Sequence, residues 1–221
     1  MKKELERTSV IASLLCNLLI IVCTAISLSG FFTAGGSGNM AVIGRKAFVY
    51  FTVDSNILCA LSSAVILVYS IRSLISGTEF VLPVWAMLFK FTGTIAVAVT
   101  FFTVMFFLGP VMGYGAMLDG NNLFMHLTSP VFALLSFILF EYNPVLTKKN
   151  SLFGILPTLV YGAIYFYMVI ILGVENGGWV DFYGFNMTGM WYLSIIGMLL
   201  GTYLIIIAVK AAGKAYHRAS K

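Results

Sequence analysis

Charged side chains are scarce in this chain. Only 10% of its 221 residues are Asp, Glu, Lys or Arg, whereas an ordinary soluble domain has about 25%. Hydrophobic residues make up 60%, and the mean hydropathy is +0.99. Too few charged groups are present to cover the surface of a soluble fold of this size. The composition therefore excludes an ordinary soluble enzyme and indicates a membrane protein.

Cysteine and histidine are also rare. The three cysteines, Cys16, Cys23 and Cys59, lie inside long apolar stretches, where a thiol behaves as a small apolar side chain. Their spacing predicts neither a disulfide framework nor a metal site. The run GGSGN is not followed by the GK[ST] of a phosphate-binding loop. We therefore expect no metal ion and no cofactor.

Six apolar stretches are long enough to cross a bilayer, which takes about 20 helical residues for roughly 30 Å of hydrocarbon. They do not alternate apolar and polar residues, so they are typical of helices and not of barrel strands. The expected spans are 10–32, 48–71, 84–108, 122–141, 152–173 and 187–209. The sequence predicts a single all-α integral membrane domain, a bundle of six transmembrane helices.

Basic residues gather at one set of span ends. If the N-terminus is cytoplasmic, ten Lys and Arg residues lie on that side and only Arg45 and Lys46 on the other, which is the positive-inside bias. We therefore expect both termini in the cytoplasm and, from the bacterial look of the start MKKELER, a bacterial inner membrane. No basic face is left for a nucleic-acid partner. The ten residues are Lys2, Lys3, Arg7, Arg72, Lys148, Lys149, Lys210, Lys214, Arg218 and Lys221.

Polar residues inside the spans are costly and so mark candidate functional positions. The densest group is YFTVDSNILCALSS in the second span, where Thr52, Ser55 and Asn56 share one helix face. Asp54 lies about 200° around the helix from Thr52 and is expected to meet a neighbouring helix. Lys90, in the third span, either pairs with Asp54 or extends its ammonium group towards the cytoplasm.

Thr52 and His126 are expected at the same depth. Both lie one to two turns below the outer boundary, on spans that enter the membrane from the same side. A histidine base beside a threonine hydroxyl is an arrangement for covalent hydrolysis. The alternative is structural, because threonine often bonds a carbonyl of its own helix. Glu141, at the other end of the His126 span, is expected at the membrane interface.

Two outer loops, 108–122 and 174–186, lack Lys and Arg and carry aromatic and acidic residues. They either fold over the outer mouth of the bundle as a lid or act as interfacial anchors, since Trp and Tyr favour that depth. In the last span, Gly197 and Gly201 have the GxxxG spacing that lets two helix backbones approach closely. This spacing indicates either packing within the bundle or a homo-oligomer formed through that helix.

Three segments resemble a known family: YFTVDSNILCAL, HLTSPVFALLSFILFEY, and VYGAIYFYMVIILG with the later WVDFYGFN. They are similar to the androgen-induced membrane hydrolases, which include the androgen-dependent regulator of tissue-factor-pathway inhibitor and bacterial six-span relatives. The resemblance runs from about residue 45 to residue 186. It implies a threonine hydrolase that cleaves fatty acid esters of hydroxy fatty acids, with Thr52 as the nucleophile and His126 as the base.

These observations lead us to predict an intramembrane hydrolase of lipid acyl esters, whose partner is a membrane lipid or a lipid-derived ester. Two other classes stay open. One is a non-catalytic membrane protein that binds a lipid or small ligand, and the other is a proton-coupled transporter that uses Asp54, Lys90 and His126 as relay groups. The candidate substrate-binding or supporting residues are Ser55, Asn56, Asp54, Lys90, Asn122, Tyr161 and Tyr165. All of these except Asp54 and Lys90 are candidate donors that orient the substrate or stabilise an oxyanion.

Overall fold

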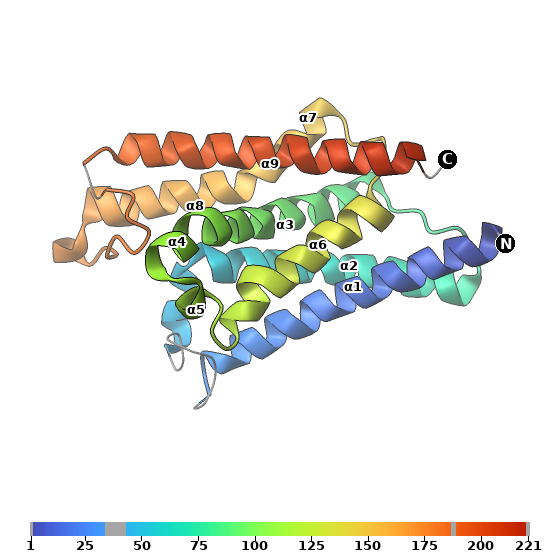
Figure 1. The fold of residues 1–221 in the computed structure, drawn as a ribbon, viewed down its shortest axis with the longest axis horizontal. Helices are drawn as coiled ribbons and strands as arrows, with labels where there is room; N and C mark the ends of the chain where they lie inside the picture. The colour runs from blue at the N-terminus through green and yellow to red at the C-terminus, as the bar shows by residue number, and fades with distance from the viewer. Residues whose placement is uncertain (1, 34–42, 187–188, 220–221) are drawn as a thin grey trace.

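The computed structural model describes residues 2–33, 43–186 and 189–219, and within those ranges it contains helices and no strands (Figure 1). Six described stretches are long and apolar enough to cross a membrane: Glu6–Gly30, Phe51–Ser76, Val84–Met112, Phe124–Glu141, Lys148–Leu172 and Trp191–Ala219. The prediction of six apolar spanning helices is confirmed. Met187, the expected first residue of the last span, lies outside the described residues, and that helix continues well beyond residue 209.

The longest helices are α1 (Lys2–Gly30), α2 (Phe51–Ser76), α3 (Val84–Thr103), α8 (Leu156–Phe166) and α9 (Trp191–Ala219). The shorter elements are η2 (Gly44–Val49), η3 (Val104–Leu108), α4 (Gly109–Met112), α5 (Tyr114–Met117), η4 (Phe124–Thr128), α6 (Ser129–Ser136), η5 (Phe137–Glu141), α7 (Lys148–Ser151), η6 (Leu152–Ile155), η7 (Tyr167–Leu172) and η8 (Val174–Asn176).

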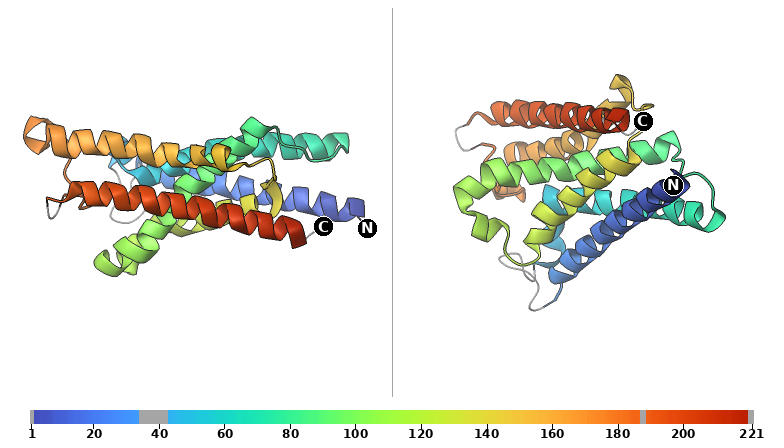
Figure 2. Two further views of the ribbon diagram at one scale, coloured as in Figure 1. Left: turned by 90° about the horizontal axis from the view of Figure 1, so that it is seen from above. Right: turned by 45° about the vertical axis from the view of Figure 1, so that its right-hand side comes forward.

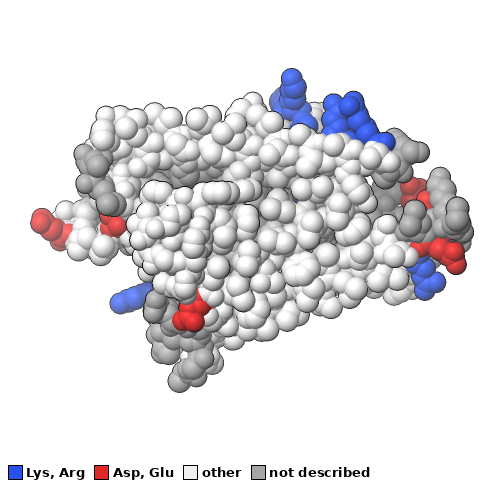
Figure 3. Space-filling model, viewed as in Figure 1, with Lys and Arg blue, Asp and Glu red and all other residues white. Residues whose placement is uncertain are grey.

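The first and last described residues lie at one end of the bundle, on the right of Figure 1. We call this the terminal end, and the opposite end the distal end. Both views in Figure 2 show the helices running roughly lengthwise between the two ends. In Figure 3 the side of the bundle that faces the viewer is uncharged over most of its length. This surface is suited to contact with lipid.

The central helix is α3, which packs against α2 on one side and α9 on another. Gly93 allows the close approach of α2, because a Cβ atom there would lie 2.6 Å from Ser62 Oγ and 3.0 Å from Cys59 Cα. Towards the terminal end, Phe91 of α3 and Ile206 of α9 share one buried apolar cluster. The three cysteines are free thiols, as expected.

Prolines widen two of the helices. Pro130 has no N–H, so the carbonyl of His126, four residues earlier, loses its α-helical donor. The turn before it is the π-helical η4, in which Ser129 N–H reaches back five residues to Phe124 O. Pro110 stands in the same relation to the π turn η3. Because such turns frequently occur at functional sites, the presence of His126 in one of them directs attention to this region.

Candidate functional site

A cavity of about 560 Å³ lies in the distal half of the bundle, between α2, α3, η3, α8, α9 and the loop before α9. Its wall is mainly aliphatic and aromatic, and none of the described residues that line it is Asp, Glu, Lys, Arg or His. The lining residues that carry a hydroxyl group are Thr52, Thr100, Thr103, Tyr161, Tyr183, Ser194 and Thr202.

Thr52 lies on the wall of this cavity, in the first turn of α2, and is half-buried. The helix starts where the loop before α9 touches it, and Phe51 N–H donates to Tyr183 Oη at 3.1 Å. Burial raises the pKa of Tyr183 to about 12, although interactions with Tyr161, Phe51 and Thr52 lower it. At neutral pH, Thr52 therefore has a neutral phenol hydroxyl beside it.

His126 is buried in η4, and its ring is oriented by a carbonyl group. Its Nδ1 atom lies 2.5 Å from Met117 O. Since a carbonyl only accepts, Nδ1 must carry the proton, and in the neutral ring Nε2 is then the basic nitrogen. The Met117 carbonyl thereby fixes the orientation of the ring, as a third group does for the histidine of hydrolytic triads in other proteins. The local geometry is thus compatible with a general base.

Thr52 and His126 are both described, and no hydrogen bond joins them; His126 also does not line the cavity. The segments that carry them are nevertheless connected by Asn56. Its Nδ2 donates to Thr52 O at 2.8 Å and to Met125 O at 3.1 Å. The two segments are therefore neighbours, as expected, but no hydrogen bond joins the hydroxyl group to the imidazole.

The buried polar neighbours of Thr52 use their donors within the protein. Ser55 Oγ lies 3.0 Å from both Thr52 O and Thr100 Oγ1. Asn56 donates twice from Nδ2, while its Oδ1 is buried without a partner. These two residues hold the start of α2 in place. Asn122 is buried elsewhere, and it does not line the cavity.

Tyr161 and Tyr165 share a face of α8, as predicted, with ring centroids 5.9 Å apart. Tyr161 Oη donates to Val49 O at 2.7 Å, and Tyr165 Oη donates to Asp181 Oδ1 at 2.8 Å. A tyrosine has a single hydroxyl proton, so in this arrangement neither residue can also donate to an oxyanion. The two hydroxyl groups instead join α8 to the end of η2 and to the loop before α9, and the geometry does not support the oxyanion role.

The loop 179–186 covers the distal end of the cavity, to which it contributes Tyr183 and Phe185. Asp181 organises the loop: its carboxylate accepts Phe185 N–H at 2.8 Å and Asn186 N–H at 2.7 Å, in addition to the Tyr165 hydroxyl. Of the two alternatives for this loop, the structure favours a lid. The other outer loop forms α4 and α5 and supplies the Met117 carbonyl.

A second polar cluster lies closer to the terminal end. Lys90 is fully buried, and its Nζ donates to Asn17 Oδ1 and Ser63 Oγ, both at 2.8 Å. Asn17 Nδ2 in turn donates to Glu141 Oε1 at 2.5 Å, so one amide joins the ammonium to the carboxylate. Two hydroxyl groups donate to the same carboxylate oxygen, those of Ser13 and Ser136.

This cluster corrects three expectations. Lys90 does not pair with Asp54, because its partner on α2 is Ser63, which lies about 14 Å along the helix from Asp54 at 1.5 Å rise per residue. Lys90 does not extend to solvent either, because it is fully buried. Asp54 is instead exposed on α2. Glu141, the last residue of its apolar stretch, is 3% exposed, and Ser13, Asn17 and Ser136 all donate to its Oε1.

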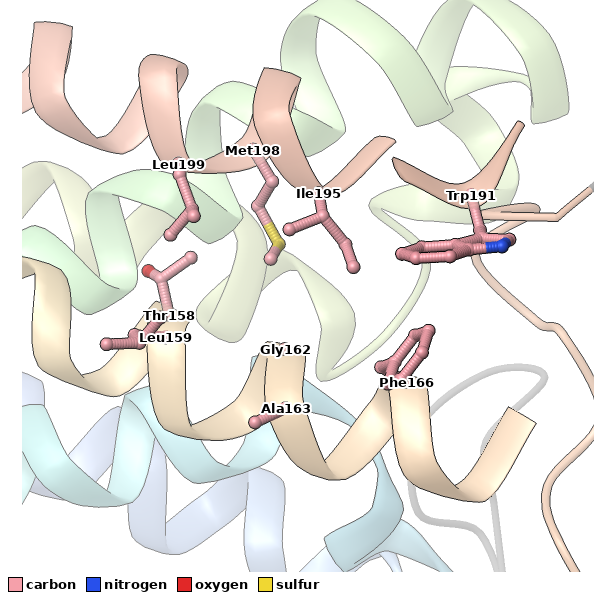
Figure 4. A pocket seen from close by; sticks show the side chains of 9 residues that line it. All are labelled: Thr158, Leu159, Gly162, Ala163, Phe166, Trp191, Ile195, Met198 and Leu199. Carbon is pink, nitrogen blue, oxygen red and sulfur yellow. The ribbon is translucent and has the colours of Figure 1, made fainter. Parts of the chain in front are cut away.

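A smaller hollow of about 300 Å³ lies between α8 and α9 (Figure 4). The rings of Phe166 and Trp191, 4.7 Å apart, lie at one end of it. Among the residues that line the hollow, only Thr158 carries a hydroxyl group, and this group accepts a hydrogen bond from Thr202 Oγ1 at 3.4 Å. The hollow therefore offers apolar contact and no reactive group.

Together these features define an α-helical, multi-pass membrane protein with an uncharged cavity beneath an aromatic loop. No protein-family model, curated protein or solved structure matches the chain. The resemblance to the androgen-induced membrane hydrolases therefore stays a prediction. The sequence did not single out Tyr183 or the Asn17 bridge as candidate residues. It did contain a signal for the π turn η4, because Pro130 follows His126 by four residues.

Proposed function

We propose that this chain is an intramembrane hydrolase of lipid acyl esters, with Thr52 as nucleophile and His126 as base. The observation that carries the proposal is the position of Thr52 on the wall of a lipid-sized cavity, with Asn56 joining its segment to that of His126. The cavity volume, about 560 Å³, falls within the range of small-molecule sites. Its uncharged lining suits an acyl ester better than an ion.

In the proposed reaction, His126 Nε2 takes the proton of Thr52 Oγ1 as that oxygen bonds to the ester carbonyl carbon. The carbon–oxygen bond to the alcohol then breaks, and the imidazolium returns the proton to the leaving alcohol. Water, deprotonated by the same nitrogen, then attacks the carbonyl carbon of the acyl-threonine. The bond from that carbon to Thr52 Oγ1 breaks, the imidazolium returns the proton to Oγ1, and the acid is released. Hydrogen bonds between catalytic groups are often long before substrate binds and tighten in the complex.

Tyr183 is the candidate donor to the developing oxyanion. Its oxygen accepts Phe51 N–H, which directs its own proton to another acceptor, and its raised pKa keeps that proton in place at neutral pH. This role replaces the one predicted for Tyr161 and Tyr165, whose protons are already donated.

We also propose that both termini are cytoplasmic and that the protein lies in a bacterial inner membrane. The excess of Lys and Arg on the terminal side supports this orientation, and the two ends of the described chain lie together (Figure 1). The cavity then lies in the outer half of the membrane, so the substrate comes from the outer leaflet.

A non-catalytic lipid-binding protein is the second candidate. It is favoured by one observation, the absence of His126 from the residues that line the cavity. It predicts that lipid binding survives Thr52→Ala and that no covalent label forms. The proton-coupled transporter has no such support, because its three relay groups have different partners and do not form a chain. Asp54 is exposed, Lys90 donates to Asn17 and Ser63, and His126 meets the Met117 carbonyl.

The test is labelling of the detergent-solubilised protein with a fluorophosphonate probe. We expect labelling of the wild type, loss of labelling in Thr52→Ala and His126→Ala, and retention in Thr103→Ala, which removes another hydroxyl of the same cavity. Size-exclusion profiles establish that all four proteins are folded. A folded wild type that takes no label contradicts the hydrolase and favours the binding protein.

A further inference from the structure

Gly197 and Gly201 do not bring α9 close to another described helix of this chain. A Cβ atom added to either residue would meet nothing within 4 Å, whereas a Cβ at Gly93, where two helices do approach, would lie 2.6 Å from Ser62 Oγ. Both glycines line the large cavity instead. The structure thus corrects the expectation that this spacing marks packing within the bundle, while contact between two copies through this helix stays a prediction.

The two glycines lie where α9 separates from α3. Towards the terminal end, Ile206 and Val209 of α9 are buried against α3, but in the distal half the cavity lies between α9 and the α3–η3 segment. Across the cavity from the glycines, Phe102 and Phe106 are stacked, with centroids 5.9 Å apart and an interplanar angle of 12°.

The cavity reaches the molecular surface at this place. Gly197 and Phe106 both line it and are both exposed, Phe106 to 75%. Both residues belong to stretches apolar enough to span the membrane, Val84–Met112 and Trp191–Ala219. The surface around the opening therefore faces lipid hydrocarbon and not water.

We propose that the gap between η3 and α9 is a lateral entrance through which the acyl chain of a neutral lipid passes from the bilayer into the cavity. Gly197 and Gly201 keep the entrance wide on one side, and Phe102 and Phe106 border it on the other. The lipid is neutral because no lining residue carries a charge that could compensate a carboxylate or phosphate at this depth.

The entrance deepens the proposed function, which supplies the reason for the lipid to enter: its ester group reaches Thr52 at the other side of the cavity. The entrance itself does not depend on catalysis. It predicts binding of an acyl chain even to a protein that cleaves nothing, and this difference makes the two proposals separable.

The test uses a monoacylglycerol with a diazirine in its acyl chain, incorporated into nanodiscs with the full-length protein and photolysed. We expect labelled peptides from the cavity wall, and about tenfold less labelling in Gly197→Leu and Gly201→Leu, because the added side chains fill the passage. Ala208→Leu is the matched control, because it places the same side chain at an exposed position of α9 that does not line the cavity. A diazirine fatty acid of equal length should label weakly.

Unchanged labelling in both glycine variants overturns the entrance, as does equal labelling by the fatty acid. If the leucine variants fail to fold, Phe106→Ala decides the question, since it widens the opening at an exposed residue and should raise labelling; no change would again overturn the proposal. Labelling that depends on the glycines, in a protein whose Thr52 takes no fluorophosphonate, would retain the entrance and remove the hydrolase. Fluorophosphonate labelling of Thr52, together with acyl-chain labelling that does not depend on the glycines, would retain only the hydrolase.

Discussion

Lys90 and Glu141 are the most deeply buried charged residues in the described part of the chain, at 0% and 3% exposure. They do not touch; the Asn17 amide lies between them, with its oxygen towards the ammonium and its nitrogen towards the carboxylate. An amide dipole oriented in this way lowers the energy of both ions. The bridge also joins α1, α3 and η5, so it specifies how three distant segments meet.

Removing one of these charges should be more damaging than removing both. We expect Lys90→Met or Glu141→Gln alone to destabilise the protein by about 3–5 kcal/mol, because each leaves an uncompensated buried charge, and the double variant to be much less affected. Thermal unfolding in detergent measures the loss of stability. Lys149→Met is the control, because it removes an exposed charge near the terminal end. A double variant as unstable as the sum of the single variants would contradict the charge pairing.

Among the structural elements, the loop 179–186 shows how one side chain can order a segment without regular structure. Asp181 accepts two backbone N–H groups and the Tyr165 hydroxyl, and Tyr183 attaches the loop to the start of α2. The loop therefore covers the cavity as a unit held at two places. Its aromatic composition alone did not distinguish this arrangement from an interfacial anchor.

Asp181→Ala should release this loop. We expect hydrogen exchange of the amides in 179–186 to increase by about tenfold or more, since several hydrogen bonds of about 1 kcal/mol each are lost, while the transmembrane helices exchange as before. Hydrogen–deuterium exchange with mass spectrometry measures the effect, and Asp119→Ala in the other distal loop is the control. Equal protection in both variants would show that the aromatic contacts hold the loop by themselves.

Two glycines in helices should respond in opposite ways to the same substitution. Gly93→Ala should destabilise the protein by about 1–3 kcal/mol, because the new methyl group clashes where α2 meets α3. Gly201→Ala meets open space and should be neutral or stabilising by up to about 1 kcal/mol, the difference in helix propensity. Unfolding midpoints of the two variants provide the comparison, and equal destabilisation would contradict the open position of Gly201.

At the scale of the entire protein, an even number of spans places both ends of the described chain on one side. The structure does not depend on which side of the membrane that is, because the helices pack in the same way in either orientation. The orientation instead follows from the Lys and Arg residues of the loops and tails.

We therefore expect a cysteine at position 175 to react with a membrane-impermeant maleimide in intact cells, and one at position 214 to react only after permeabilisation. Glu175→Cys lies in η8 at the distal end, and Lys214→Cys lies near the end of α9; both residues are exposed. The background is a variant without Cys16, Cys23 and Cys59, which also serves as the unlabelled control. Labelling at position 214 from outside would reverse the topology.

The number and approximate bounds of the spans could be predicted from apolar length, because hydrocarbon leaves each segment no partner for its backbone except itself. The shared face of Tyr161 and Tyr165 followed from the helical period in the same way. The partners of these residues did not follow, since a period gives the face of a helix and not the neighbour it meets. Lys90 meets Asn17 and Gly201 meets a cavity because α3 lies at the centre of the bundle and α9 diverges from it, and only long-range packing sets those positions.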